Sequence, residues 1–181
     1  MYDLRKLSPK QLILLFIVVL AIYFTGFNPA DENNNDNNFI SGTVSRVVDG
    51  DTLILNVSGH DRRVRLLGVD TPETVHPKKK TEFYGPEASN FTKKNLTGKK
   101  IWLEYDKAPR DKYNRHLAYI WLVKPQNINE NSIRDYMFNA KLLLGGYAKK
   151  LIIKPNSKYA DIFSKFELEA RNLKRGLWKK N

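Results

Sequence analysis

Residues 44–67 read VSRVVDGDTLILNVSGHDRRVRLL, and this stretch decides the fold. Apolar and polar residues alternate along it, as they do in strands that bury one face. Asp49-Gly50 and Ser58-Gly59 interrupt the alternation with residues that form tight hairpin turns. We therefore expect three antiparallel strands joined as a meander, over Phe39–Val48, Thr52–Val57 and Arg62–Leu67.

The rest of the chain adds two strands and three helices to this meander. The further strands are KIWLEY at Lys100–Tyr105 and LAYIWLV at Leu117–Val123. Helices are expected at Pro86–Leu96, at Phe138–Leu144, and between a cap at Ser157 and a stop at Gly176. Short strands with a few helices indicate an α+β fold, and the order of the elements is compatible with a five-stranded OB-type β-barrel.

The N-terminal segment has the pattern of a signal peptide or signal-anchor helix. Leu12–Phe24 is apolar throughout, and Arg5, Lys6 and Lys10 precede it. The run is shorter than the ~20 residues that span a bilayer comfortably, but a poor cleavage pattern favours the uncleaved transmembrane anchor over the cleaved signal. The basic residues keep the N-terminus in the cytoplasm. The rest of the protein is therefore expected to be secreted or to lie on the extracellular face of the cell membrane.

A polar linker separates this hydrophobic helix from the folded domain. Residues 31–38 read DENNNDNN, which contains no apolar residue and forms a flexible tether. The expected organisation is a signal or anchor at 1–30, a linker at 31–38 and one folded domain at 39–181, monomeric in solution.

Composition narrows the chemistry of the protein and its partners. The 181 residues include no cysteine, which excludes disulfide scaffolds, zinc-thiolate sites and a cysteine nucleophile. The net charge is +12, from 31 basic and 19 acidic residues. Residues 1–30 hold three of the basic residues and one of the acidic ones, so the remainder keeps +10. Polyanions, either nucleic acid or an acidic membrane surface, are the expected partners.

Four acidic residues cluster where predicted strands end. Asp49 and Asp51 flank the first hairpin turn, and Asp70 and Glu73 lie in VDTPET after the third strand. Carboxylates from two loops, with a backbone carbonyl between them, form a hard oxygen site suited to Ca²⁺. Each cluster alone is also ordinary turn chemistry, so the spacing leaves both interpretations open.

Two arginines accompany these acids. Arg65 lies on the outward face of the third strand and has the opposite parity to Asp70, so the two share a cleft only if the chain bends near Gly68. Arg115 precedes another predicted strand. A guanidinium can hold a phosphate bidentately and stays charged at any working pH, while a solvated strand charge is the alternative for either arginine.

Five motifs resemble the staphylococcal nuclease (thermonuclease) family. They are RVVDGDT at 46–52, RVRLLGVDTPET at 63–74, YGPEAS at 84–89, DKYNRHLAYI at 111–120 and GLWKK at 176–180. The similarity runs in the family's order from about Ser41 to Trp178. It implies a five-stranded OB-type β-barrel with three α-helices. It also implies a Ca²⁺-dependent phosphodiesterase that cuts DNA and RNA, leaving 3′-phosphate ends.

The same resemblance implies a ligand set for the cation. Asp51 and Asp70 correspond to the carboxylates that bind Ca²⁺, and Thr71 adds its backbone carbonyl. Asp49 corresponds to the neighbouring acid that supports this shell.

Roles on the substrate side follow in the same way. Glu73 corresponds to the carboxylate that positions or deprotonates the attacking water, and Arg65 and Arg115 correspond to the pair that grips the scissile phosphate. The residues that match nucleotide contacts are Lys79, Lys112 and Tyr113.

The chain also departs from the family pattern. Leu151 occupies the position of an aromatic residue that stacks on a base, which predicts weaker or altered substrate binding. Asn114 replaces a glycine and is expected to keep the turn, because Asn tolerates left-handed backbone angles. Residues 123–136 form a longer connection, which we expect to be a surface loop. Solvated positions without a catalytic role are expected for His60, His76 and His116.

Lysines interleaved with tyrosines outside the site suit a single strand of DNA or RNA. Two other functions fit the same features. A non-catalytic nucleic-acid-binding module would use the barrel without its chemistry, since barrels of this type often only bind. A membrane-surface protein would use the basic charge alone.

Overall fold

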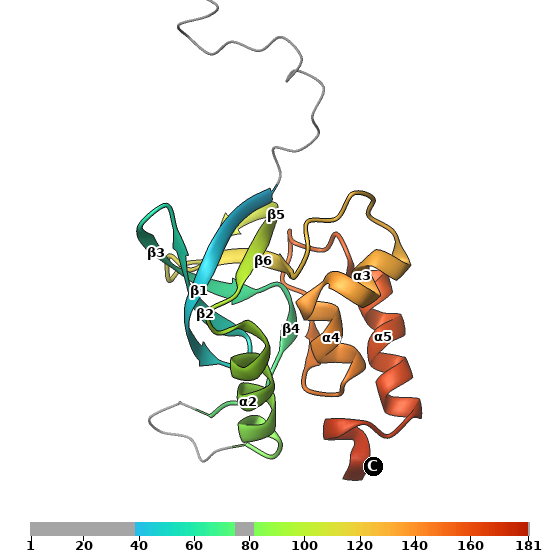
Figure 1. The fold of residues 1–181 in the computed structure, drawn as a ribbon. Helices are drawn as coiled ribbons and strands as arrows, with labels where there is room; N and C mark the ends of the chain where they lie inside the picture. The colour runs from blue at the N-terminus through green and yellow to red at the C-terminus, as the bar shows by residue number, and fades with distance from the viewer. Residues whose placement is uncertain (1–38, 75–81, 181) are drawn as a thin grey trace, which may run out of the picture. The chain divides into compact units, whose positions relative to one another are not determined.

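The computed structural model describes residues 39–74 and 82–180, and five strands of this part close into a barrel (Figure 1). Going round the barrel, the strands follow the order β1, β2, β3, β6, β5. Their bounds are β1 (Phe39–Asp49), β2 (Thr52–Val57), β3 (His60–Leu66), β5 (Lys100–Arg110) and β6 (His116–Trp121). Neighbouring strands run antiparallel except β3 and β6, which are parallel. The predicted meander and the five-stranded barrel are confirmed.

Alternation along the meander sorts side chains between the core and the site. Leu53, Leu55 and Val64 are fully buried inside the barrel. Thr52 pairs with Arg65 in the β2–β3 register, and Arg65 projects from the opposite face to Val64. The hydrophobic pattern therefore fixes which strand residues can reach a ligand.

A sharp bend after β3 turns the chain toward the site. Gly68 has φ +76°, and a Cβ atom there would lie 2.4 Å from the Phe163 ring, so a larger residue would fit neither the backbone angle nor the space. The bend begins β4 (Gly68–Asp70), which pairs antiparallel with β7 (Lys149–Leu151) in a small second sheet. It supplies the change of direction that the parity of Arg65 and Asp70 requires.

In the part of the chain that the structure describes, four α-helices, rather than three, accompany the barrel. They are α2 (Gly85–Leu96), α3 (Glu130–Tyr136), α4 (Phe138–Leu144) and α5 (Ala160–Asn172), and a 3₁₀ turn, η4 (Gly176–Lys180), follows. Helix α2 lies at one end of the barrel against β1, whereas α4 and α5 pack on each other beside it (Figure 1).

The additional helix lies in the connection that we expected to be a surface loop. Asn129 caps α3: its Oδ1 accepts from Ser132 N at 2.9 Å, and its own N–H donates to Ser132 Oγ at 2.9 Å. This reciprocal pair satisfies backbone donors at the helix start. The Asn content of residues 123–136 indicated a loop, but Asn is equally a strong N-cap.

Other boundaries also differ from the sequence expectation. Ser157 does not cap α5, which begins at Ala160 after Tyr159 and ends before Gly176. The short strands β4 and β7 were not expected. The N-terminal hydrophobic helix and the linker lie outside the described residues. Within 39–74 and 82–180, no helix is long and apolar enough to cross a membrane.

One buried amide joins the helices to the barrel. Asn139 of α4 accepts from Ile120 N at 2.8 Å and donates to the Leu67 carbonyl at 2.7 Å. It is completely buried, so these two backbone groups depend on it for their hydrogen bonds. Asn139 thereby connects α4 to β6 and to the segment that leads into the bend.

His116 is buried, contrary to the expectation that it is solvated. It is 9% exposed at the start of β6, and its Nδ1 lies 2.7 Å from the Tyr105 hydroxyl. Burial lowers the pKa of His116 from its ordinary value of 6.5, and the charges of Arg110 and Arg62 lower it further. His116 is therefore mainly neutral in the folded domain at neutral pH.

The domain is expected to lose stability in mild acid because of this histidine. The unfolded chain binds a proton at His116 more readily than the folded one, so the stabilisation is complete above pH 6.5 and declines below it. The contribution of His116 to stability is fully lost below the lowered pKa of the folded state. Urea unfolding at about pH 8 and about pH 5 measures the change. The His116→Asn variant should lose less stability over this interval than the parent, and equal losses would contradict the assignment.

Candidate active site

The turn between β1 and β2 packs against the segment that follows β4. A Cβ atom on Gly50 would lie 2.6 Å from Thr71 Oγ1, so glycine permits the close approach. The Asp51 carboxylate accepts from Thr71 N at 2.8 Å and from Thr71 Oγ1 at 3.0 Å. The Asp51 carbonyl accepts from Leu66 N at 2.9 Å. Asp51 is only 6% exposed, and it holds segments distant in sequence together.

Arg65 bridges the two predicted metal-binding carboxylates. Its Nη1 lies 3.0 Å from Asp51 Oδ2, and its Nη2 donates to Asp70 Oδ1 at 2.8 Å. Nη1 also donates to the Val69 carbonyl at 2.9 Å and to the Leu66 carbonyl at 3.1 Å. Nε and the second N–H of Nη2 take part in none of these contacts. The bend at Gly68 has therefore brought Arg65 and Asp70 into one cleft.

Thr74 organises the acids beside this pair. Its hydroxyl donates to Asp49 Oδ1 at 2.6 Å, and its backbone N–H donates to Glu73 Oε1 at 3.2 Å. Burial raises the pKa of Asp49 and the Glu73 carboxylate adds to the rise, while hydrogen bonds from Thr74 and Gly50 oppose it. Sequence reasoning did not single out Thr74, although a threonine directly after Pro-Glu in a turn is a common local hydrogen-bond donor.

Arg115 is held by the turn between β5 and β6. Asp111 Oδ1 accepts from the backbone N–H groups of Tyr113 and Arg115, each at 2.9 Å, and Oδ2 accepts from Arg115 Nε at 2.7 Å. Burial alone would raise the pKa of Asp111, but the hydrogen bonds and charge of Arg115 lower it. Asn114 adopts φ +60°, as expected for its turn position. The Asp111 contact uses Nε and leaves both terminal nitrogens of Arg115 outside it.

Asp111 is the positioning residue that the sequence analysis missed. The signal was present, because an aspartate that opens a turn accepts hydrogen bonds from the N–H groups that follow it. Its carboxylate fixes the Arg115 side chain, which is 26% exposed, at the edge of the site.

One cavity of about 150 Å³ gathers residues from all these segments. Its lining includes Thr71 and every acid and arginine predicted for catalysis, metal binding or support: Asp49, Asp51, Arg65, Asp70, Glu73 and Arg115. We refer to it as the catalytic cavity. Groups separated by more than sixty residues therefore meet within the reach of one small ligand.

The residues predicted to contact the nucleotide lie either beside this cavity or outside the described residues. Tyr113 is 68% exposed on the turn that carries Arg115. Lys112 Nζ lies 5.0 Å and the Arg115 guanidinium 5.6 Å from the centroid of the Tyr113 ring. Neither Lys112 nor Tyr113 is part of the catalytic cavity's lining. Lys79 lies outside the described residues.

A second cavity, of about 240 Å³, adjoins the first through Arg65 and Arg115. We call it the Arg115 cavity. Leu151 and Ile153 line it and are 39% and 59% exposed. Leu151, predicted to occupy the position of a stacking aromatic residue, therefore presents an aliphatic surface beside Arg65 and Arg115.

The donor set of the catalytic cavity fits a hard divalent cation. Asp51 and Asp70 approach one another across the Arg65 guanidinium, so the site already brings both carboxylates to a single cationic group. Carboxylate and peptide oxygens, such as the Thr71 carbonyl, are the ligands that Ca²⁺ takes, with water filling its shell. Across the described ranges, no three acidic or histidine side chains are grouped as a ready metal cluster. A cation here would thus keep several waters.

The surroundings of Asp70, a predicted metal ligand, shift its pKa. Partial burial raises the pKa of Asp70; the Arg65 charge opposes this rise, and the Asp51 and Glu82 charges reinforce it. A bound divalent cation would favour the ionised form.

These features define a class of protein: an OB-type barrel whose surface carries an acidic, arginine-lined site for a cation and an anionic group. The domain model for staphylococcal nuclease homologues matches residues 63–180. The chain belongs to the staphylococcal nuclease family.

Named relatives agree with this assignment. The thermonuclease of Staphylococcus intermedius is 41% identical over 179 residues, which cover 98% of this chain and 100% of the relative. The thermonuclease of Staphylococcus hyicus is 40% identical over 178 residues, covering 97% and 99%. The SPbeta prophage-derived endonuclease YokF of Bacillus subtilis is 37% identical over 140 residues, which cover 77% of this chain and 44% of that protein.

Proposed function

We propose that the protein is a nuclease: a Ca²⁺-dependent endonuclease that hydrolyses phosphodiester bonds in DNA and RNA and leaves 3′-phosphate ends. The observation that carries this proposal is the convergence of Asp51, Asp70, Glu73, Arg65 and Arg115 on one cavity. The family membership and the names of the thermonuclease relatives support it. The net charge of +12 suits a polyanionic substrate, preferably a single strand.

The charges of the cavity suit a phosphodiester. The four acids that line it exceed its three arginines, which include Arg63, by one negative charge, so a divalent cation leaves one net positive charge for the substrate. The further negative charge that develops in the pentacoordinate transition state is then stabilised. Asp51, Asp70 and the Thr71 carbonyl would hold Ca²⁺, which supplies Lewis-acid polarisation of a phosphate oxygen and a template for the substrate.

The chain's own residues perform the remaining tasks. Arg115 presents both terminal nitrogens to the phosphate, because Asp111 takes only its Nε. Arg65 donates through the N–H groups that its carboxylate partners leave outside their contacts. Glu73 hydrogen-bonds a water and aligns it with phosphorus, either positioning it or accepting its proton as the new P–O bond forms. The bond from phosphorus to the 5′ oxygen breaks at the same time, and that oxygen leaves with a proton taken from solvent. No side chain is required as a covalent nucleophile.

Location is a separate part of the proposal. The apolar N-terminal segment supports a protein that is secreted or tethered to the extracellular face of the cell membrane, with the linker as tether. N-terminal sequencing of the native protein distinguishes a cleaved signal from an anchor. An intact Met1 on membrane-bound protein supports the anchor, and a start near residue 31 on soluble protein supports secretion.

Removing Ca²⁺ is expected to abolish cleavage of single-stranded DNA in a zymogram of the protein. Asp51→Asn should raise the Ca²⁺ concentration for half-maximal activity at least about 100-fold, because loss of mere supporting groups already costs ~10–100-fold in metal affinity. Ser45→Ala, on the exposed outer face of β1, is the matched control and should behave as the parent. Full activity in chelator, or an unchanged Ca²⁺ dependence in Asp51→Asn, would overturn the assignment of that site.

The alternative is a barrel that binds nucleic acid without cutting it. It predicts a gel shift that weakens steeply with salt, with no cleavage when Ca²⁺ is present. The complete set of acids and arginines around the cavity favours the enzyme.

A further inference from the structure

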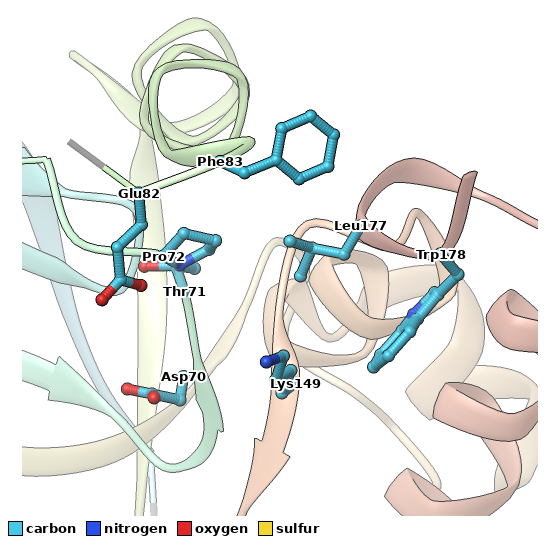
Figure 2. Close-up of a pocket in the computed structure, with 8 residues that line it drawn as sticks. All are labelled: Asp70, Thr71, Pro72, Glu82, Phe83, Lys149, Leu177 and Trp178. Carbon is cyan, nitrogen blue, oxygen red and sulfur yellow. The ribbon is translucent and has the colours of Figure 1, made fainter. Parts of the chain in front are cut away.

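A third cavity adjoins the catalytic one on the side away from Arg115. It measures about 310 Å³, at the lower end of the ~300–1,000 Å³ typical of ligand pockets. It shares Asp70 and Thr71 with the catalytic cavity, whereas the Arg115 cavity shares Arg65 and Arg115 with it. The three cavities therefore form a series, with the catalytic one in the middle. We call the third the Phe83 pocket (Figure 2).

The two sides of the Phe83 pocket differ in chemistry. Figure 2 shows the carboxylates of Asp70 and Glu82 on one side of the pocket. Asp70 also lines the catalytic cavity. The Phe83 ring, Leu177 and Trp178 lie on the other side and form apolar walls. The pocket is thus suited to the flat apolar part of a ligand whose other part reaches the catalytic cavity.

Phe83 is a half-exposed member of a series of aromatic rings. It is 50% exposed, and its ring centroid lies 5.8 Å from that of Tyr84. Tyr84 stacks on Tyr147 at 5.7 Å, and Tyr147 stacks on Phe91 at 4.2 Å. The rings anchor Phe83 against the domain while leaving part of its surface open. A planar ligand can extend such a stack at little entropic cost, because the ring is already positioned.

Backbone contacts fix Phe83 relative to the catalytic residues. Glu82 N donates to the Glu73 carbonyl at 3.0 Å, and Gly85 N donates to the Glu82 carbonyl at 3.1 Å. A Cβ atom on Gly85 would lie 3.2 Å from both the Pro72 and Glu73 carbonyls, so the start of α2 packs tightly on the catalytic segment. A ligand on Phe83 would therefore lie in a defined place relative to Glu73.

The opposite wall and the floor supply a rigid surface and a positive charge. The Arg171 guanidinium lies 4.1 Å from the centroid of the Trp178 ring and holds it in place. Trp178 Nε1 is buried and, within the described chain, has no hydrogen-bond partner, so this wall carries an unused donor. Lys149 of β7 pairs with Asp70 of β4 and lines the pocket beside it. Its ammonium group can attract a phosphate of a ligand that extends out of the catalytic cavity into this pocket.

We propose that the Phe83 pocket binds the base of the nucleotide that flanks the cleaved phosphate on the side opposite the Arg115 cavity. The base stacks on Phe83 between the apolar walls, and Lys149 attracts the adjoining backbone phosphate. This inference rests on the proposed nuclease function. Its support is the position of the pocket, continuous with the catalytic cavity, and the pairing of an exposed aromatic ring with a lysine, which is the combination that binds single strands.

The test is a double-mutant cycle between Phe83 and one base of the substrate. The full chain, with Ca²⁺, cuts end-labelled single-stranded DNA in which one nucleotide is normal or carries a stable abasic sugar. Product lengths give the kcat/KM of each bond. In the parent, removing the base should slow cleavage about 5- to 150-fold at the bond on one side of that nucleotide. In Phe83→Ala, cleavage of the normal strand should fall by a similar factor, and removing the base should add less than about a further twofold.

Control variants separate stacking from a general disturbance. Phe83→Trp should retain the penalty for removing the base, because indole also stacks. Tyr136→Ala removes another exposed aromatic, on α3, and should retain the parent's penalty. Two results would overturn the pocket assignment. In the first, the fold-losses of kcat/KM caused by Phe83→Ala and by base removal simply multiply when both changes are made. In the second, the Phe83→Ala variant cuts as the parent does. A parent that cuts neither strand would instead overturn the nuclease function itself.

Discussion

Replacing Arg115 by Ala is expected to lower kcat for single-stranded DNA about 10²–10³-fold, because it removes donors aimed at the charge that develops on the phosphate. Asp111 holds Nε of Arg115 at 2.7 Å, and this contact leaves both terminal nitrogens available to a bound phosphate. The substitution should leave folding nearly intact, since the side chain lies at the rim of the barrel and is 26% exposed.

Steady-state cleavage of a labelled oligonucleotide measures the loss, and urea unfolding shows that the variant is folded. Arg115→Lys should recover only part of the rate, because an ammonium lacks the planar fork that grips two phosphate oxygens. Arg46→Ala, an exposed arginine on β1, is the matched control and should keep the parent's kcat. A loss confined to KM would show that Arg115 binds ground state and transition state alike.

Replacing Glu104 by Ala is expected to lower the free energy of unfolding by about 3–5 kcal/mol, because it breaks a buried charged network. Glu104 is 1% exposed. Its carboxylate accepts from Trp121 Nε1 at 2.7 Å and from the Tyr159 hydroxyl at 2.9 Å, and it pairs with Lys158. Truncation leaves two buried donors without an acceptor between β5, β6 and the start of α5.

Urea unfolding gives the size of this effect, and two variants separate its causes. Glu104→Gln keeps an oxygen for Trp121 or Tyr159 but loses the charge, so it should cost less than Glu104→Ala. Lys158→Ala removes a partner that is 41% exposed and should cost least. If all three variants were equally unstable, the ion pair rather than the buried hydrogen bonds would be the main source of stability.

Much of the barrel could be predicted from local sequence. The alternation in residues 44–67 sets which side chains are buried, and turn residues set where the strands reverse. Helix α3 was missed because Asn serves both loops and N-caps, and only the partnership of Asn129 with Ser132 distinguishes the two. Ser157 failed as a cap because the chain becomes helical only after Tyr159, which packs into the core beside Tyr119 and Phe163.

Residue spacing alone predicted less of the site than of the barrel. The acids in two turns suggested a metal site and equally suggested ordinary turns, and the family resemblance separated the two interpretations. The bridge from Arg65 to both carboxylates depends on a bend at Gly68 that must clear Phe163 of α5. No local pattern encodes a contact between residues so far apart. The Phe83 pocket likewise combines β4, the segment just before α2, β7 and η4, which come together only in the folded chain.

The buried amide of Asn139 has a consequence for how short a working version of this protein can be. Its two hydrogen bonds tie a helix from the second half of the chain to Ile120 near the end of β6 and to the peptide just before Gly68. A fragment cut after β6 would contain all the proposed active-site residues, yet it would lack the clamp that sets their spacing. Removal of α4 is thus expected to impair cleavage, although every residue proposed for catalysis precedes that helix in the chain.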